Sequence, residues 1–243
     1  KSISNRLFVS TTGKKDKIDF LITEPKKIKD NQLVVVGFLN WDKEHPEAKI
    51  IKTIGEQGVV DNEIHAILQE YNLPYDFSDE LIKEAENLKK LQNIEETNKR
   101  KDLRNITTIT IDPEDAKDFD DAISIEIKKH TTEIGIHIAD VSHFLKKDSI
   151  LDKEAYLRGT SVYLVDRVVP MLPESLSNNL CSLRPNEDKY TFSALFTFNE
   201  KHQIIDQWFG KTIINSNQRF SYNEAQYIIE TKKETIPKEV SLS

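Results

Sequence analysis

The first 55 residues alternate short apolar runs with polar, lysine-rich loops. The apolar runs fall at residues 7–9, 18–22, 33–39 and 50–54. Runs of this length, rich in branched side chains and bounded by Gly, Pro and Lys, are typical of β-strands. Four strands at this spacing predict a small antiparallel β-barrel over residues 1–55.

Residues 56–103 have a helical periodicity instead and are predicted to form a linker. Apolar side chains recur along one face over residues 61–71, which predicts a helix with Asp61 as its N-cap. Ser78 is placed to begin a second helix, whose apolar stripe and charged outer face continue to about residue 100. We therefore expect two helices in this linker.

From residue 104 onward the pattern mixes strands and helices, which predicts an α+β domain over residues 104–243. A first strand is predicted at 106–111. Isoleucines at every second position over 123–127 alternate with polar residues and predict a half-buried strand. A return strand is predicted at 134–138, so that these two strands form a hairpin.

Three further signals support this mixed domain. A helix is predicted near 150–158, where a glycine follows and stops it. Another hairpin is predicted to pair residues 192–198 with 204–209. Ser221 and Glu224 have the spacing of a capping box and predict the start of a last helix.

The segment between the first two strands of this domain concentrates negative charge. Residues 112–121 contain six acids and one lysine. Asp112 ends one predicted strand, and Asp120 and Asp121 begin the next. A connection of this kind can fold back, so we expect Asp112 to lie close to Asp118, Asp120 and Asp121.

Such a group of carboxylates needs a physical explanation. Two unit charges about 6 Å apart repel by about 3 kcal/mol at an effective dielectric constant of about 20. The carboxylates must therefore protonate, stay apart in water, or bind a cation. Oxygen ligands without His or Cys favour Mg²⁺ or Mn²⁺ over Zn²⁺. A site of this type can support metal-assisted hydrolysis of a phosphodiester.

A purely structural interpretation competes with the metal site. Asp112 followed by Pro113 is also a good helix start, with Glu114 and Asp115 in its first turn. This alternative does not account for the later aspartates from Asp118 onward. A calcium loop fits poorly because the glycine at its sixth position is missing. On spacing alone, the metal site and the helix start both stay open.

Five sequence blocks in this region are distinctive. They read TIDPEDAKDFDDA from Thr110, IGIHIADVSH from Ile134, RGTSVYL from Arg158, PMLPE from Pro170 and LSNNLCSL from Leu176. In this order they resemble the catalytic (RNB) domain of the RNase II/RNase R family of exoribonucleases, and most of all its bacterial ribonuclease R members. Residues 1–55 are similar to the cold-shock (OB-like) barrel that precedes this domain. The resemblance implies that barrel, a helical linker over 56–103, and the N-terminal part of a mixed α+β catalytic domain.

The resemblance also implies an activity and a site. Members of the family hydrolyse single-stranded RNA processively from the 3′ end, release nucleoside 5′-monophosphates and require Mg²⁺. By their place in the family motif, Asp112, Asp118 and Asp121 are expected to hold metal, with Mg²⁺ or Mn²⁺ as the ion. Asp120 is also expected at the metal, where it matters most for the chemical step through the metal-bound water.

Two tyrosines are implied as RNA-binding residues by the same resemblance. Tyr163 matches the residue that stacks on the 3′-terminal base, and Tyr222 matches a second aromatic that faces the substrate. Stacking on an aromatic ring is worth about 1–3 kcal/mol per base and ignores base identity. Without the motif, Tyr163 reads as a core residue of a strand between Val162 and Leu164.

Composition and charge set the remaining expectations. With 37% hydrophobic and 31% charged residues, the chain is expected to be a soluble globular protein. A single cysteine, Cys181, and no apolar run of about 18 residues favour a cytoplasmic protein without a membrane anchor. The net charge of −7 owes much to residues 112–121. Residues 1–55 have 11 basic and seven acidic residues, a net charge of +4 that permits an RNA partner.

Lysine-rich loops of the barrel are in most proteins a solvated surface, and a place for RNA to approach is the second interpretation here. The lysines are Lys14, Lys15, Lys26 and Lys27. The resemblance implies a monomer. Because the family's catalytic domain continues beyond the matched blocks, we expect this chain alone to be weak or inactive. The alternative function is a non-catalytic RNA-binding module.

Overall fold

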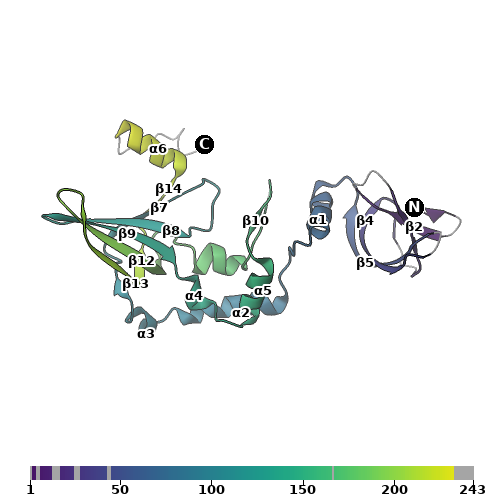
Figure 1. Cartoon of the computed structure of the whole chain (residues 1–243), viewed down its shortest axis with the longest axis horizontal. Helices are drawn as coiled ribbons and strands as arrows, with labels where there is room; N and C mark the ends of the chain where they lie inside the picture. The colour runs from purple at the N-terminus through teal and green to yellow at the C-terminus, as the bar shows by residue number, and fades with distance from the viewer. Residues whose placement is uncertain are drawn as a thin grey trace. The chain divides into compact units, whose positions relative to one another are not determined.

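The computed structural model describes residues 2–3, 6–12, 17–24, 28–42, 45–165 and 167–232 (Figure 1). The chain forms two compact units, residues 1–76 and 77–243. The four loop lysines singled out above, at positions 14, 15, 26 and 27, lie outside the described residues. No helix in the described part of the chain is long and apolar enough to cross a bilayer.

The first unit is a five-stranded sheet with the order β1-β2-β3-β5-β4. Its strands are β1 Ser2–Ile3, β2 Arg6–Ser10, β3 Asp19–Ile22, β4 Gln32–Asn40 and β5 Glu47–Glu56. All four predicted strands are therefore confirmed. The pairing of β3 with β5 is parallel, and the other described pairs are antiparallel. Phe20, Ile22, Ala48 and Ile50 form its buried centre.

The predicted first helix is present as α1, Val60–Glu70, but its predicted cap is wrong. Val59 occupies the N-cap position without a side-chain hydrogen bond, and Asp61 lies within the first turn. Other side chains form the hydrogen bonds at the start of this helix. The Gly58 backbone N–H donates to the Glu63 carboxylate at 2.8 Å, and the Asn62 amide donates to the Glu56 carbonyl at 3.0 Å.

The second unit begins with helical segments that are shorter than predicted. Ser78 caps α2, Asp79–Asn87, by accepting a hydrogen bond from the Leu81 N–H at 3.3 Å, as the sequence predicts. A single helix to about residue 100 is wrong. A 3-10 turn, η1 (Leu88–Leu91), and a short helix, α3 (Ile94–Thr97), follow, because the Asn93 side chain caps a new helix at the Glu96 N–H.

The main sheet of the second unit has seven strands in the order β14-β7-β8-β9-β12-β13-β6. They are β6 Lys101–Asp102, β7 Thr107–Asp112, β8 Asp121–Ile127, β9 Thr131–Ala139, β12 Asp188–Asn199, β13 Ile204–Asn215 and β14 Gln218–Ser221. Both predicted hairpins, β8 with β9 and β12 with β13, are confirmed. The edge strands β6 and β14 pair in parallel with β13 and β7.

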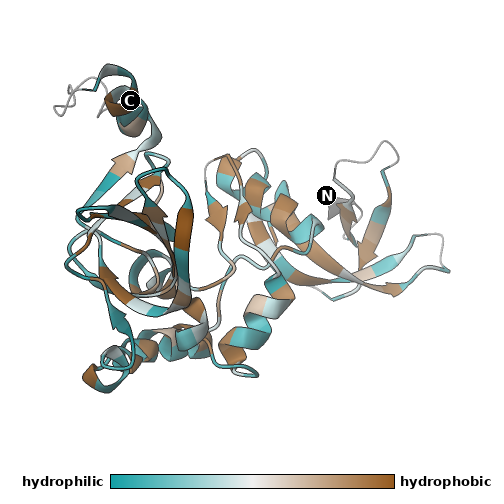
Figure 2. Ribbon diagram, turned by 60° about the vertical axis from the view of Figure 1, so that its left-hand side comes forward, coloured by the Kyte–Doolittle hydropathy of each residue, from teal (hydrophilic) through white to brown (hydrophobic). Residues whose placement is uncertain are grey.

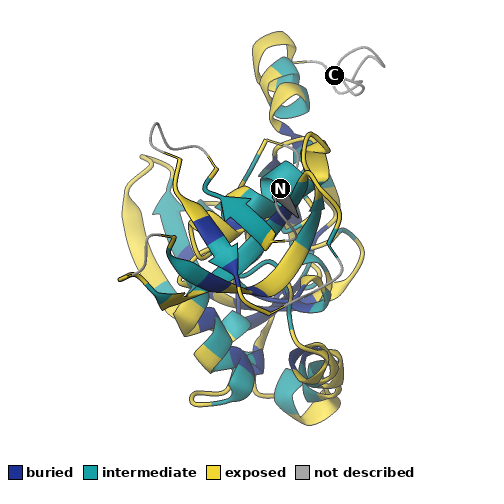
Figure 3. Ribbon diagram, turned by 90° about the vertical axis from the view of Figure 1, so that its right-hand side faces the viewer, coloured by how far each residue is buried: buried dark blue, intermediate teal, exposed yellow. Residues whose placement is uncertain are grey.

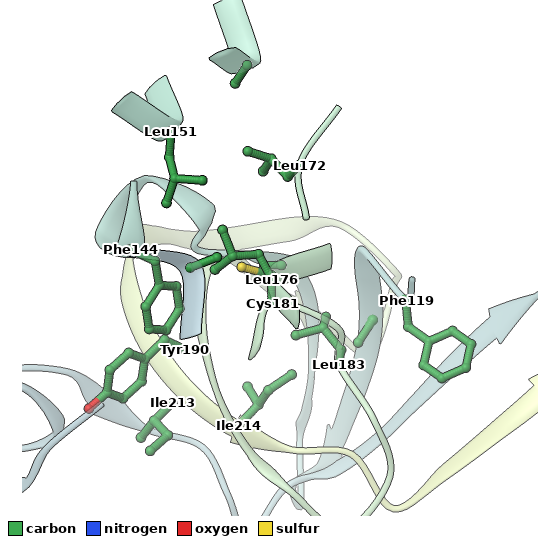
Figure 4. Packing of buried hydrophobic residues seen from close by; sticks show 14 of the residues in the cluster. Phe119, Phe144, Leu151, Leu172, Leu176, Cys181, Leu183, Tyr190, Ile213 and Ile214 are labelled. Atoms are coloured by element: carbon green, nitrogen blue, oxygen red, sulfur yellow. The ribbon is translucent and has the colours of Figure 1, made fainter. Parts of the chain in front are cut away.

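Shorter elements complete the second unit. They are α4 Val141–Phe144, α5 Ile150–Arg158, β10 Val162–Tyr163, β11 Val168–Val169, the π-helical turn η2 Ser175–Leu180, and α6 Tyr222–Thr231. The predicted helix stop is confirmed, since Gly159 follows α5 with a φ of 74°. A cluster of buried side chains includes Phe144, Leu176 and Leu183, with Phe119 at one end beside Leu183 (Figure 4). The α+β prediction holds.

In strands β8 and β9 of the main sheet, the face with the polar residues is buried and the face with the isoleucines is exposed. This is the opposite of the usual arrangement. Apolar and polar residues alternate along these strands (Figure 2), and buried and exposed residues follow one another there (Figure 3). However, Ile123 and Ile136 are each 43% exposed, whereas Ser124 is 6% exposed. The buried side carries a polar network instead. His137, fully buried, lies between the hydroxyls of Ser124 at 2.8 Å and Ser193 at 2.7 Å. This hydrogen-bonding satisfies the polar face, so burying it is tolerated.

The buried histidine gives a pH-dependent stability. Burial lowers the pKa of His137 to about 4, against about 6.5 in an unfolded chain. Between these values the unfolded chain binds a proton that the folded chain refuses. The stabilisation is therefore complete above about pH 6.5, and the free energy of unfolding falls by up to about 1.4 kcal/mol per pH unit as the pH drops toward 4.

We expect His137→Gln to remove this part of the pH profile in urea denaturation measured from pH 4 to pH 8. His202→Asn is the matched control, because His202 is exposed in a turn with a positive φ that asparagine also adopts. It should retain the slope of the native chain. An identical slope in His137→Gln and the native chain would show that His137 titrates normally.

Candidate active site

The acidic loop connects two antiparallel strands at the same end of the main sheet. Strand β7 ends at Asp112 and β8 begins at Asp121, and the pairing of Ile109 with Ile123 sets their register. The eight residues between them form turns without a helix. The alternative that Asp112 starts a helix is therefore wrong, and the loop returns Asp121 toward Asp112 as the sequence predicts.

The aspartates of this loop lie close enough to influence one another. Burial raises the pKa of Asp112, and the charges of Asp121 and Asp118 add to this effect against the opposing Thr110 and Arg219. The pKa of Asp120 is raised by partial desolvation and by the charges of Asp118, Asp121 and Asp112. Asp120 is exposed at its surface, but the surrounding protein still withholds part of its hydration. Both shifts indicate carboxylates without enough positive charge nearby.

Asp112 also lacks hydrogen-bond partners for part of its carboxylate. Its side chain is buried, at 8% exposure, and its Oδ2 atom has no hydrogen-bond partner. The Thr110 side chain lies on the same face of the strand, where it opposes the rise in the pKa of Asp112. An unpartnered buried carboxylate oxygen is costly, and a bound cation would relieve both this cost and the mutual repulsion of the aspartates.

The aspartates thus fit a divalent cation by the type of their ligand atoms, but not by a complete coordination geometry. Within the described ranges, no three Asp, Glu, His or Cys side chains are grouped closely enough to hold a metal ion. The four predicted ligands, Asp112, Asp118, Asp120 and Asp121, still offer the hard oxygen donors that Mg²⁺ and Mn²⁺ prefer. The metal site remains a prediction.

Tyr163 lies beside the acidic loop. It ends β10, which pairs with β11, and its hydroxyl donates to Asp118 Oδ2 at 3.2 Å. Partial burial and the charge of Asp118 raise its pKa. At 68% exposure the side chain is no core residue, so the structural alternative for Tyr163 is wrong. An exposed ring tethered to the acidic loop is available for stacking.

Tyr222 is brought to the same end of the sheet by β14. This strand pairs in parallel with β7, and Ser221 lies opposite Asp112. Tyr222 follows as the first residue of α6 and is 58% exposed. The predicted capping box is confirmed, since Ser221 accepts from the Glu224 N–H at 3.2 Å and Glu224 accepts from the Ser221 N–H at 2.8 Å.

Two side chains that hold the acidic loop were not predicted from the sequence. Ser182 bonds to the loop backbone at Lys117 and Phe119, and Arg219 bonds to the carbonyl oxygens of Pro113 and Glu114. Ser182 lies in the LSNNLCSL block, and Arg219 comes just before the capping box. Their positions within or beside these motifs were the sequence signal that could have marked them as functional residues.

The other residues considered from the sequence have structural surroundings. Cys181 is buried, and burial raises the pKa of its thiol to about 12. Arg184 donates to the Asn179 side chain at 3.1 Å and lies 3.7 Å from Glu187. The His143 ring lies 3.6 Å from Glu96. These contacts fit packing and pairing and indicate no ligand.

Comparison with known families identifies the class of both parts of the chain. Residues 8–78 match the family profile of the cold shock domain, and residues 100–242 match that of the RNB domain. The architecture is thus a cold-shock domain followed by an RNB domain. Since the second match covers more than half of the chain, the protein belongs to the RNB family.

Individual relatives agree with this membership. The chain is 41% identical over 204 residues to DIS3-like exonuclease 2 of Xenopus tropicalis, covering 82% of this chain and 24% of that protein. It is 37% identical over 231 residues to ribonuclease R of Thermotoga maritima, covering 92% of this chain and 32% of that protein. The chain therefore spans about a quarter to a third of the length of these relatives.

Solved structures show the same fold. Mycoplasma genitalium RNase R in complex with double-stranded RNA matches with a TM-score of 0.81 and 27% identity, over 93% of this chain and 41% of that one. Yeast Ssd1, a pseudonuclease, matches with a TM-score of 0.69 and 20% identity, over 96% of this chain and 31% of that one. A shared fold alone does not decide catalysis.

Proposed function

We propose that the parent protein of this chain is a 3′→5′ exoribonuclease that hydrolyses single-stranded RNA processively to nucleoside 5′-monophosphates with Mg²⁺ or Mn²⁺. The observation that carries the proposal is the acidic loop that joins β7 to β8 at one end of the sheet, beside the exposed ring of Tyr163. Relatives named ribonuclease R and DIS3-like exonuclease support it.

The roles of the side chains follow from their chemistry. When bound, Mg²⁺ would supply charge neutralisation at the scissile phosphate and activation of the attacking water. Asp112, Asp118, Asp120 and Asp121 would provide its oxygen ligands. Asp120 would matter most for the chemical step, by orienting the attacking water and accepting its proton. The Tyr163 ring stacks on the 3′-terminal base, and Tyr222 faces the RNA behind it.

The stacking role predicts a loss of RNA affinity in Tyr163→Ala. One lost stack of about 1–3 kcal/mol weakens binding of a short single-stranded RNA by about 5–150-fold. Tyr163→Phe retains the ring and should bind within about threefold of the native chain. Tyr156→Ala is the matched control, because Tyr156 is a 91% exposed tyrosine on α5. Fluorescence anisotropy measures all four proteins, and equal affinity for Tyr163→Ala and the native chain would remove the stacking role.

The proposal includes the location, the oligomeric state and the substrate of the protein. We place the activity in the cytoplasm, with a monomer acting on single-stranded RNA. The chain alone is weak or inactive, because it spans about a quarter to a third of the length of its relatives. The remainder is expected to supply further residues near the scissile phosphate.

Product analysis tests the proposal. The chain, extended through the rest of its catalytic domain, is incubated with unlabelled single-stranded RNA, and the products are separated by ion-exchange chromatography. Nucleoside 5′-monophosphates as the main product agree with the proposal. Nucleoside 3′-monophosphates would mean a different chemistry, and intact RNA that stays bound would favour the non-catalytic RNA-binding module.

A further inference from the structure

Two side chains from distant parts of the sequence hold the two limbs of the acidic loop. Arg219, on the edge strand β14, donates from one terminal nitrogen to the carbonyl oxygens of Pro113 and of Glu114, the latter at 2.7 Å. These carbonyls belong to the limb that leaves Asp112. The guanidinium also lies 5.5 Å from the centroid of the Phe119 ring.

Ser182 holds the second limb, around Asp118. Its hydroxyl accepts from the Phe119 N–H at 3.0 Å and donates to the Lys117 carbonyl at 2.9 Å. The side chain is fully buried, and the next residue adds a third bond, from the Leu183 N–H to the Phe119 carbonyl at 2.8 Å. The backbone on both sides of Asp118 is therefore fixed to one buried hydroxyl.

Phe119 anchors the loop between these contacts. Its side chain is 9% exposed and belongs to the main buried cluster, where it lies beside Leu183 (Figure 4). The loop thus has fixed points in each limb, whereas the carboxylates that it presents all carry negative charge. Without those fixed points, the loop backbone would sample more conformations, and a cation would have to order it on binding at an entropic cost.

We propose that Ser182 and Arg219 are positioning residues that preorganise the acidic loop for a divalent cation. This inference rests on the metal site of the proposed function. Both side chains bond to the backbone of the loop, so each acts through that backbone. Preorganised ligands bind more tightly because less ordering remains to be done on binding.

The proposal predicts two measurable changes in Ser182→Ala and Arg219→Met. In the cation-free chain, amide hydrogen exchange of residues 113–120 becomes about tenfold faster, while β9 and β12 exchange as in the native chain. In calorimetric titration with Mn²⁺, the affinity falls by about tenfold. Arg219→Lys retains the charge and a donor but not the planar fork, and should recover part of the affinity.

Two controls separate positioning from general loss of stability. Ser149→Ala removes the hydroxyl that caps α5, so it lowers thermal stability without touching the loop. Arg104→Met removes an arginine that pairs with Asp102 and Asp188. Both should bind Mn²⁺ as the native chain does and leave the exchange of residues 113–120 unchanged.

Each contrary result has a distinct meaning. Unchanged exchange in residues 113–120 of both variants overturns the positioning roles, whatever the Mn²⁺ affinity. Faster exchange with native Mn²⁺ affinity shows that the loop is held but not for the cation, which also overturns the proposal. If the native chain binds no Mn²⁺ at all, the metal site of the proposed function itself fails in this chain.

Discussion

Asp120→Asn is expected to lower the rate of RNA cleavage by about 10²–10⁴-fold, the usual contribution of a positioned acid–base group. The amide has nearly the same shape as the carboxylate but accepts no proton. Asp120 is exposed at the loop surface, which leaves its carboxylate accessible to an attacking water. The measurement is single-turnover cleavage in the chain extended through its catalytic domain.

RNA affinity is the second readout of the same variant. Binding by Asp120→Asn should stay within about threefold of the native protein, because the stacking and phosphate contacts are untouched. Asp115→Asn is the matched control, with the same charge change at an exposed position of the same loop. Loss of binding together with cleavage in Asp120→Asn would point to a structural role for this carboxylate.

Asp140→Asn is expected to destabilise the second unit by about 1.5–3 kcal/mol, because it leaves the buried Arg100 with Glu96 as its remaining carboxylate partner. The Arg100 guanidinium is fully buried and lies 2.8 Å from Asp140, whose side chain is 2% exposed. The same guanidinium lies 4.0 Å from the centroid of the Tyr190 ring. Asparagine retains an oxygen for the N-cap of α4, so the variant isolates the charge.

The pKa of Asp140 gives this prediction a pH dependence. Burial alone would raise it, but hydrogen bonds from Arg100 and Ser142 and the charges of Arg100 and Lys211 outweigh burial and hold the pKa below its usual value. A lowered pKa stabilises the fold above the unfolded value of about 3.9, and the stabilisation is lost as the pH falls through the folded value. The difference between native and variant should therefore shrink in acid.

An exposed ion pair provides the control for the buried one. Asp102 bonds to Arg104 at the surface, with side chains 50% and 36% exposed. Asp102→Asn should cost at most about 1 kcal/mol. Urea denaturation of both variants at pH 7 makes the comparison. Similar losses in the two would mean that burial does not set the value of the Asp140 pair.

The sequence predicted the elements of this protein better than their environments. The prediction of the hairpin strands around Ile123 and Ile136 is confirmed, because alternation and turn residues are local signals. Alternation does not say which face is buried, and here the polar network around His137 takes the buried face. The break before α3 depends on the Asn93 side chain, which competes locally with a continuous helix.

In the candidate site, too, local features could be predicted from the sequence and contacts between distant residues could not. The return of the acidic loop from Asp112 to Asp121 could be predicted, since it follows from two neighbouring strands. The contacts of Ser182 and Arg219 with this loop could not, because they join residues about 65 and 105 positions apart in sequence. Only the pairing of β14 with β7 and the packing of the 176–183 block bring them together.

The most direct test of the central claim uses 5′-labelled single-stranded RNA and the chain extended through its catalytic domain. Product lengths are read on a denaturing gel after incubation with Mg²⁺ or with a chelator. We predict shortening from the 3′ end to a few nucleotides with Mg²⁺ and none with the chelator. Equal shortening in both, or RNA that remains intact with Mg²⁺ present, would contradict a metal-dependent exoribonuclease built on Asp112, Asp118, Asp120 and Asp121.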